Sequence, residues 1–192
     1  MEIEISHLSF EELDNFIQEG DFSIKNDFVF MVKKTEEKDF TSFGIKKMPF
    51  KTEITSKEFK KEFKINQYRD MIKEIMQRDK ISFKAICNGE ICGVIVAENE
   101  QWEDTIFIDE LVVDKVFRNM GVGSQLLKAV KKAARSKNVS QLMLQVDCRN
   151  YSAIYFYIKG GFKIIGVIQR RIPVLLLVDH IEKFRKEVKK DE

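Results

Sequence analysis

The sequence predicts an α+β domain in which a central mixed, mostly antiparallel twisted sheet is flanked by helices in α/β/α layers. Two observations predict this class. Three strand-like apolar runs follow one another between Ile81 and Val113, and the first two are joined by the turn Asn88-Gly89. Behind them, two helical patterns alternate with two more strand-like runs as far as Ile168, an order that builds one mixed sheet.

Residues 1–55 predict an extension ahead of these elements. Ser9-Phe10-Glu11-Glu12 matches a capping box, which opens a short helix with its apolar face at Leu13, Phe16 and Ile17. A strand is expected from Phe28 to Val32. Residues 34–55 are polar and show no clean period, so they predict a strand-and-loop segment.

A longer helix is predicted from Ser56 to Lys80. Its buried face follows the i, i+3, i+4, i+7, i+8 spacing and comprises Tyr68, Met71, Ile72, Ile75 and Met76. The nearby lysines are expected on a solvated face: Lys60, Lys61 and Lys64.

The dipeptide Asn88-Gly89 is the strongest short-range signal for a hairpin in the chain. A two-residue turn there pairs Ile86 with Ile91 and Ala85 with Cys92. In that register Cys87 and Cys92 do not face each other, which argues against a disulfide between them. The three cysteines, Cys148 included, are therefore expected to be reduced core thiols of a cytoplasmic protein.

The remaining chain predicts alternating strands and helices. The amphipathic helix after the third strand turns five residues inward: Leu126, Leu127, Val130, Ala133 and Ala134. The expected elements are the strand Thr105–Val113, the helix Gly123–Ser136, the strand Gln141–Val146, the helix Tyr151–Lys159, the strands Phe162–Ile168 and Ile172–Val178, and a charged helix His180–Lys189.

Composition excludes several classes of protein. With 33 Lys and Arg against 31 Asp and Glu, the net charge of +2 gives no basis for binding nucleic acid. No apolar run approaches the roughly 20 residues of a membrane span, and the acidic start Met1-Glu2-Ile3-Glu4 is unlike a signal peptide. The two histidines, His7 and His180, stand at opposite ends of the chain, so neither a metal site nor a His-based triad is expected.

The turn Arg118-Asn119-Met120-Gly121-Val122-Gly123-Ser124 joins a strand directly to a helix. Such an Arg-x-x-Gly-x-Gly turn aims backbone N–H groups and a helix N-terminus at one point, which suits the pyrophosphate of a nucleotide cofactor. The alternative is a turn whose glycines only permit close packing. The spacing differs from both the dinucleotide fingerprint and the P-loop.

Two more motifs accompany this turn. The preceding strand ends Ile108-Asp109-Glu110-Leu111-Val112-Val113, and downstream lies Asn150-x-x-Ala153-x-x-Phe156-Tyr157-x-x-Gly160-Gly161-Phe162. Together the three pieces resemble the GNAT superfamily of acyl-CoA-dependent N-acetyltransferases. The likeness covers about residues 66–168, and it implies one GNAT domain over residues 1–192 with acetyl-CoA as cosubstrate and no metal.

The resemblance implies a role for each motif. The backbone amides from Arg118 to Ser124, which include those of Asn119, Met120, Gly121, Val122 and Gly123, would hold the pyrophosphate. The strand end Leu111, Val112 and Val113 would pair with the pantetheine arm, and one N–H there would polarise the thioester carbonyl. Asn150 matches the residue that hydrogen-bonds the pantetheine region, and Tyr157 the tyrosine that protonates the departing thiolate.

Amine acetylation also needs a proton acceptor, because a free amine with a pKa near 10.4 is protonated at neutral pH. Asp109 and Glu110 immediately precede the cofactor strand, and alternation sends them to opposite faces. By position Asp109 matches the acidic residue of polyamine and related acetyltransferases. Glu110 is expected to be a solvated carboxylate, and becomes the base if a bulge swaps the two faces. For Tyr157, the alternative to the role of proton donor is that of a core aromatic on an amphipathic helix.

The acceptor is expected to be a small cationic amine. Six acids and no Lys or Arg occur from Glu98 to Glu110, a run that would attract a cation or else form a solvated loop. Within it Trp102, Glu103 and Asp104 are candidate substrate contacts, Trp102 through a cation–π or stacking surface or else as a core anchor.

Within the superfamily, Trp102 through Val113 and the Asn88-Gly89 hairpin are most similar to streptothricin acetyltransferases. The likeness ends after Gly166, where Gly166-Val167-x-x-Arg170-Arg171 is closer to acetyltransferases of protein N-termini. The resemblance therefore implies an N-acetyltransferase, monomer or homodimer, for a streptothricin-like or aminoglycoside-like antibiotic and hence for antibiotic resistance. The alternatives are a peptide or protein amine as acceptor, or a non-catalytic acyl-CoA-binding module.

Overall fold

The computed structural model of the chain describes residues 2–100, 104–170 and 173–181. The helices are α1 (Phe10–Glu19), α2 (Ser56–Phe63), α3 (Asn66–Asp79), α4 (Val122–Ser136) and α5 (Tyr151–Lys159), with a 3-10 turn η1 (Lys115–Phe117). The strands are β1 (Glu4–His7), β2 (Ile24–Glu37), β3 (Phe40–Ile54), β4 (Phe83–Cys87), β5 (Glu90–Glu100), β6 (Thr105–Val113), β7 (Gln141–Asp147), β8 (Lys163–Ile168) and β9 (Val174–His180).

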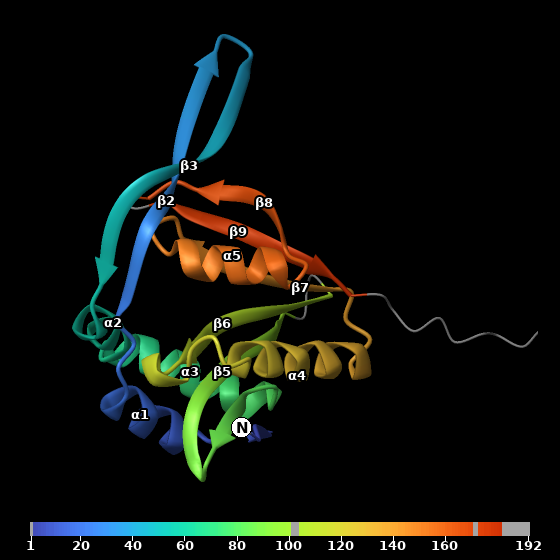
Figure 1. Ribbon diagram of the computed structural model, residues 1–192. Coiled ribbons are helices and arrows are strands. Elements are labelled where there is room, and N and C mark those ends of the chain that lie inside the picture. Colours follow the sequence, from blue (N-terminus) through green and yellow to red (C-terminus); the bar gives the residue numbers. More distant parts are fainter. Residues whose placement is uncertain (1, 101–103, 171–172, 182–192) are drawn as a thin grey trace, which may run out of the picture.

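Seven strands form one sheet in the order β1-β4-β5-β6-β7-β9-β8 (Figure 1). Within this part of the chain, β6 and β7 make the parallel pair, and the other neighbours are antiparallel. The expectation of a mixed, mostly antiparallel sheet is confirmed. The remaining two strands, β2 and β3, pair only with each other.

Helices cover both faces of the sheet, and each face has its own apolar core. One core joins α4 and α5 to the sheet, through buried side chains such as Leu126, Ile154 and Ile106. The other joins the first three helices to the opposite face, through side chains such as Ile72 and Val94. The layered α/β/α arrangement follows, because each amphipathic helix buries its apolar stripe against one face.

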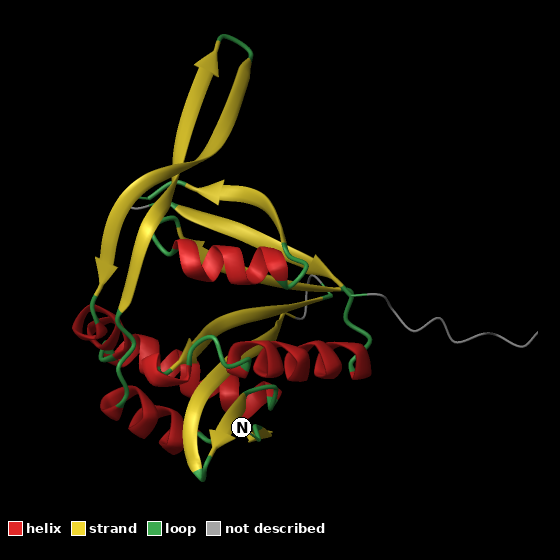
Figure 2. Cartoon of the chain, in the orientation of Figure 1, coloured by secondary structure: helices red, strands yellow, loops and turns green. Residues whose placement is uncertain are grey.

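The N-terminal region is more regular than its sequence indicates. The capping box of α1 forms as expected, with Ser9 and Glu12 each accepting from the other's backbone N–H. Residues 34–55, however, are the second half of a long two-stranded ribbon, in which β2 pairs with β3 (Figure 2). Most of its residues are exposed, so the alternation that marks a half-buried strand is missing. The short strand β1 was likewise not predicted.

The helix expected from Ser56 to Lys80 is two helices. α2 ends at Phe63, and α3 begins after an extended residue, Ile65. On α3 the predicted core positions Ile72, Ile75 and Met76 are buried, but Met71 is 42% exposed and the prediction for it is wrong. All five predicted positions lie on α3, and Met71 stands at the solvent-facing margin of its apolar stripe.

A bulge changes the expected register of the β4–β5 hairpin. Ile86 pairs with Ile91 as expected, but Ala85 pairs with Gly93, which leaves Cys92 as the extra residue of β5. Cys87 and Cys92 face the same core, their Cα atoms lie 5.9 Å apart in this bulged register, and their sulfurs form a disulfide. The expectation of two unpaired thiols here is therefore wrong. Cys148 is a free buried thiol, as expected, and burial raises its pKa to about 11.

The later elements lie close to their expected ranges, from β6 to β9. The end of the chain differs, because His180 still belongs to β9, and residues 182–189 of the expected terminal helix lie outside the described part. Among the helices of the described ranges, none is both long and apolar enough to cross a membrane.

Candidate active site

The strands β6 and β7 diverge at one end of the sheet. Their pairing runs only from Thr105 with Gln141 to Ile108 with Leu144. Beyond Ile108 the ribbons separate (Figure 1), while β6 stays paired with β5 on its other side as far as Val113. The edge of β6 that carries Leu111, Val112 and Val113 is thus placed where an extended ligand can pair with it as an added strand.

The turn after β6 directs backbone N–H groups toward the start of α4. Asn119 and Gly121 adopt positive φ angles of 62° and 87°. Gly121 is the N-cap of α4 and provides no side-chain cap, so the first N–H groups of this helix lack that acceptor. An anion at this helix end would be stabilised by those donors and by the helix dipole.

The two glycines of the turn serve different purposes. A Cβ at Gly121 would meet nothing within 4 Å, so the space over this residue is open, as a phosphate group would need. A Cβ at Gly123 would lie 3.4 Å from the ring of Phe156 and 3.7 Å from Leu111 Cδ2. These are ordinary van der Waals distances, so Gly123 packs at the junction of α4, α5 and β6 without an enforced close approach. The local geometry fits the pyrophosphate of a CoA ligand.

The side chain of Arg118 points away from that helix end. Its Nε donates to the Val113 carbonyl at 3.1 Å, and its Nη1 to the Ser23 carbonyl at 2.6 Å. Burial lowers the pKa of this guanidinium. Close by, the amide of Lys115 donates to the Asp21 carbonyl at 3.0 Å. Arg118 thus fastens the turn to the segment that leads into β2, and its side chain does not face the proposed phosphate position.

The helix α5 carries the two downstream candidates, Asn150 and Tyr157. Asn150 caps α5, with its Oδ1 accepting from the Ala153 amide at 3.1 Å. Tyr157 is 5% exposed and packs edge-on against Phe156 and Phe162. Burial, and next the negative charge of Glu110, raise the pKa of the Tyr157 phenol. Tyr157 is therefore a core aromatic on the face of the sheet that α4 and α5 cover.

A bulge in β6 changes the positions of the two candidate bases. Glu110 pairs with Val96, and the next residue of β5, Ala97, pairs with Ile108, so Asp109 is the extra residue. The alternation of faces is reset there: Ile108 lies in the core with α4 and α5, and Val112 in the core with the first three helices. Strict alternation is therefore interrupted at Asp109, and Glu110 lies on the face that alternation from Ile108 would not give it. Oδ2 of Asp109 is buried at the bulge.

Glu110 is half-buried and held by a side chain from another element. The hydroxyl of Tyr68, on α3, donates a short hydrogen bond to Glu110 Oε1. The expectation of a solvated Glu110 is therefore wrong, because the bulge aims this side chain at the face that α2 and α3 cover.

Glu110 lies in the lining of a cavity of about 190 Å³, which we call the aromatic pocket. Its lining residues come from α2, the α2–α3 junction, α3 and β6, and they are Phe59, Phe63, Ile65, Tyr68 and Glu110. The rings of Phe63 and Tyr68 meet edge-on, with centroids 5.9 Å apart. Neither phenylalanine was selected from the sequence. Their i, i+4 spacing on a lysine-rich helix is the signal that could have found them.

Of the expected acidic run, Glu110 lines this pocket, whereas Glu98 and Asp104 lie elsewhere. Glu98 pairs with Arg78 at 2.9 Å. Asp104 adjoins the opposite end of β6, six residues and about 20 Å along the strand from Glu110. Trp102 and Glu103 lie outside the described residues.

Comparisons with known proteins agree with this geometry. The family model "Acetyltransferase (GNAT) family" matches residues 49–162, more than half of the chain. The matched range contains α2, α3, the aromatic pocket, the turn at Gly121 and Tyr157.

Two curated relatives illustrate the sequence likeness. N-alpha-acetyltransferase 30 of Dictyostelium discoideum is 29% identical over 111 residues, which are 57% of this chain and 58% of that protein. A streptothricin acetyltransferase of Escherichia coli is 30% identical over 89 residues, 46% of this chain and 51% of that protein. The matches thus span little more than half the length of these relatives.

Two solved structures share the fold. Nourseothricin acetyltransferase superposes with a TM-score of 0.75 at 20% identity, over 95% of this chain and all of the other. A Bacillus anthracis protein described as a streptothricin acetyltransferase, in complex with acetyl coenzyme A, gives a TM-score of 0.70 at 23% identity, over 93% of this chain and 99% of the other. At these identities the likeness is one of fold.

Proposed function

Because the chain belongs to the acetyltransferase (GNAT) family, we propose that it moves the acetyl group of acetyl-CoA to a primary amine of a small cationic molecule. The observation that carries the proposal is the divergence of β6 from β7 beside the open turn at Gly121, an arrangement that fits an extended CoA ligand. Glu110 on β6 and Tyr157 on α5 are then the candidate proton acceptor and proton donor that acetyl transfer needs.

In this proposal the amine attacks the thioester carbonyl directly, and the C–N bond forms as the C–S bond breaks. Glu110 accepts a proton from the amine, directly or through water, and Tyr157 donates a proton to the departing sulfur. The backbone of the turn from Arg118 to Ser124 would bind the pyrophosphate, and the β6 edge at Leu111–Val113 the pantetheine arm. Asp109, buried at the bulge, is the alternative base.

The relatives suggest two kinds of acceptor. The streptothricin acetyltransferase of Escherichia coli favours a streptothricin-like antibiotic, with aminoglycosides as a related choice. The N-alpha-acetyltransferase of Dictyostelium discoideum favours the N-terminal amine of a peptide. A catalytically silent acyl-CoA-binding module is the third reading, and the presence of Glu110 and Tyr157 argues against it.

An amine panel assayed by release of free CoA thiol tests the proposal. The panel contains streptothricin, an aminoglycoside, polyamines, simple alkylamines and N-terminal peptides. Turnover of a small amine supports the proposal, and turnover of peptides alone would show that the acceptor is the N-terminal amine of a peptide. Calorimetric titration with acetyl-CoA is run in parallel. Binding of acetyl-CoA without turnover of any amine would favour the non-catalytic acyl-CoA-binding module. Absence of binding would contradict acetyl-CoA as the cosubstrate.

A further inference from the structure

We propose that the aromatic pocket accepts a single ammonium group carried on an apolar stem, and that a second positive charge on the acceptor weakens binding. The inference rests on the proposed function and narrows its substrate class. It follows from the lining of the pocket, its size and the lysines of the helix α2.

The walls of the pocket are apolar and partly aromatic. Of the five residues in its lining, Glu110 supplies the charge, while Phe59, Phe63 and Ile65 supply apolar surface. An ammonium group leaving water needs a counter-charge, and aromatic faces add a favourable cation–π contact. One carboxylate compensates one ammonium group. Among the described side chains of this lining, a second ammonium group would meet no such partner.

The volume of the pocket limits the stem. About 190 Å³ is less than the roughly 300–1,000 Å³ of sites for drug-sized ligands. It has room for about six water-sized groups, at about 30 Å³ each. A short alkyl or aryl stem fills such a space, whereas a large polycation could insert only one arm.

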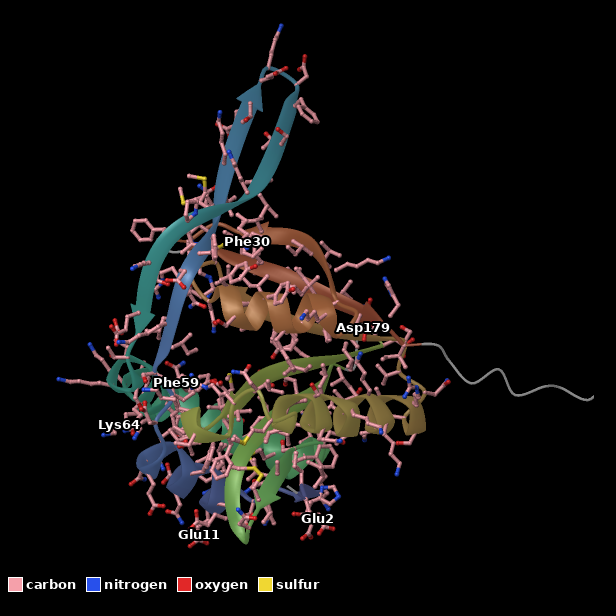
Figure 3. All side chains as sticks on the ribbon, viewed as in Figure 1. Glu2, Glu11, Phe30, Phe59, Lys64 and Asp179 are labelled. Atoms are coloured by element: carbon pink, nitrogen blue, oxygen red, sulfur yellow. A yellow bond between two sulfur atoms is a disulfide. The ribbon has the colours of Figure 1, made fainter. Side chains whose placement is uncertain are left out.

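The helix α2, which lines the pocket, also carries positive charge outside it. The helix that provides Phe59 and Phe63 also carries a row of lysines, which with Ser56 line a neighbouring hollow: Lys57, Lys60, Lys61 and Lys64. Figure 3 shows Phe59 and Lys64 on this helix at one edge of the molecule. Lys60 is held in place, because its Nζ donates to the Gln18 carbonyl at 2.7 Å. A charge on the far end of a stem would lie among like charges within a Debye length.

The direct test compares two acceptors that differ by one terminal charge, hexylamine and 1,6-diaminohexane. Free-thiol release measures kcat/KM for each at low ionic strength. Calorimetric titration into the CoA-saturated protein measures their binding independently of turnover. We expect hexylamine to exceed the diamine by about tenfold in both measurements, and the ratio to shrink as salt is added.

Charge reversal at two lysines of α2 provides a second test. The double variant Lys61→Glu, Lys64→Glu should bring the ratio close to one by favouring the diamine. The matched control is Lys132→Glu, an exposed lysine on α4, which covers the opposite face of the sheet, and it should keep the wild-type ratio.

The outcomes separate this inference from the proposed function. Equal or better use of the diamine, or failure of hexylamine to bind the CoA complex, overturns the single-charge pocket even if acetyl transfer occurs. Selective binding of hexylamine without any thiol release supports the pocket and counts against acetyl transfer.

Discussion

The hydroxyl of Tyr68 donates a hydrogen bond to Glu110 Oε1, which links α3 to β6 across 42 residues of sequence. The bond fixes the direction of the one carboxylate in the aromatic pocket. It is available because the bulge at Asp109 turns Glu110 toward the helices that cover that face. The proposed base therefore belongs to the lining of the aromatic pocket and is held there by another lining residue.

Replacing Glu110 tests its role as the proposed base. Glu110→Gln keeps the shape of the side chain and removes its proton-accepting charge, so kcat should fall roughly 100- to 10,000-fold while acetyl-CoA binding is retained. Steady-state kinetics and calorimetry measure the two effects. Asp109→Asn is the matched control and should lower kcat far less. A larger loss with Asp109→Asn than with Glu110→Gln would make Asp109 the base.

Tyr68 is expected to act through Glu110. Tyr68→Phe removes the hydroxyl and keeps the ring in the pocket, so kcat should fall by about tenfold, an energy typical of a hydrogen bond to a charged group. In the Glu110→Gln background the same change should have little further effect. This double-mutant cycle isolates the coupling, and additive losses in kcat would contradict it.

The raised pKa of Tyr157 predicts the alkaline side of the pH profile. An ordinary tyrosine has a pKa of about 10. Because burial and the charge of Glu110 raise that of Tyr157, its phenol stays protonated beyond this value and can still donate. The kcat of the wild type should therefore show no alkaline loss below about pH 10. Tyr157→Phe should lower kcat at every pH, and unchanged turnover would remove Tyr157 from the reaction.

Gly121 and Gly89 form a matched pair for the phosphate turn. Their φ angles are 87° and 86°, and a Cβ on either would meet nothing within 4 Å. Alanine should cost about 1 kcal/mol of stability at both positions, through the positive φ alone. Only Gly121→Ala should also raise the acetyl-CoA dissociation constant, as measured by calorimetry. An equal effect of Gly89→Ala would show that the loss is general.

The start of α1 should stabilise the fold in a pH-dependent way. Hydrogen bonds, first from Lys84 and then from Ser9, lower the pKa of Glu12 below its ordinary 4.5. A lowered pKa means that this contribution is present above pH 4.5 and is lost as pH falls through the folded-state value. Glu12→Gln should therefore reduce the free energy of unfolding at pH 7, and the difference from wild type should shrink toward pH 3. Urea denaturation measures both, and a difference independent of pH would contradict this role.

Elements with a local cause were predictable. The capping box at Ser9 satisfies N–H groups within one turn, and Asn88 and Gly89 adopt the positive φ angles of 54° and 86° that a two-residue hairpin needs. The long β2–β3 ribbon was not, because its strands are stabilised by each other's backbone while most of their side chains remain exposed. Without burial there is no alternation to detect.

The sequence by itself determined the order of elements from β4 to β9, the strand–turn–helix at Gly121 and the presence of a carboxylate and a tyrosine at places that match acetyltransferases. Tertiary structure alone decided which residues meet. Single extra residues at Cys92 and Asp109 shift the pairing register of their strands, and a bulge depends on pairing with a neighbouring strand, which no local pattern encodes. That is why the partner of Cys87 and the surroundings of Glu110 became visible only in the folded chain.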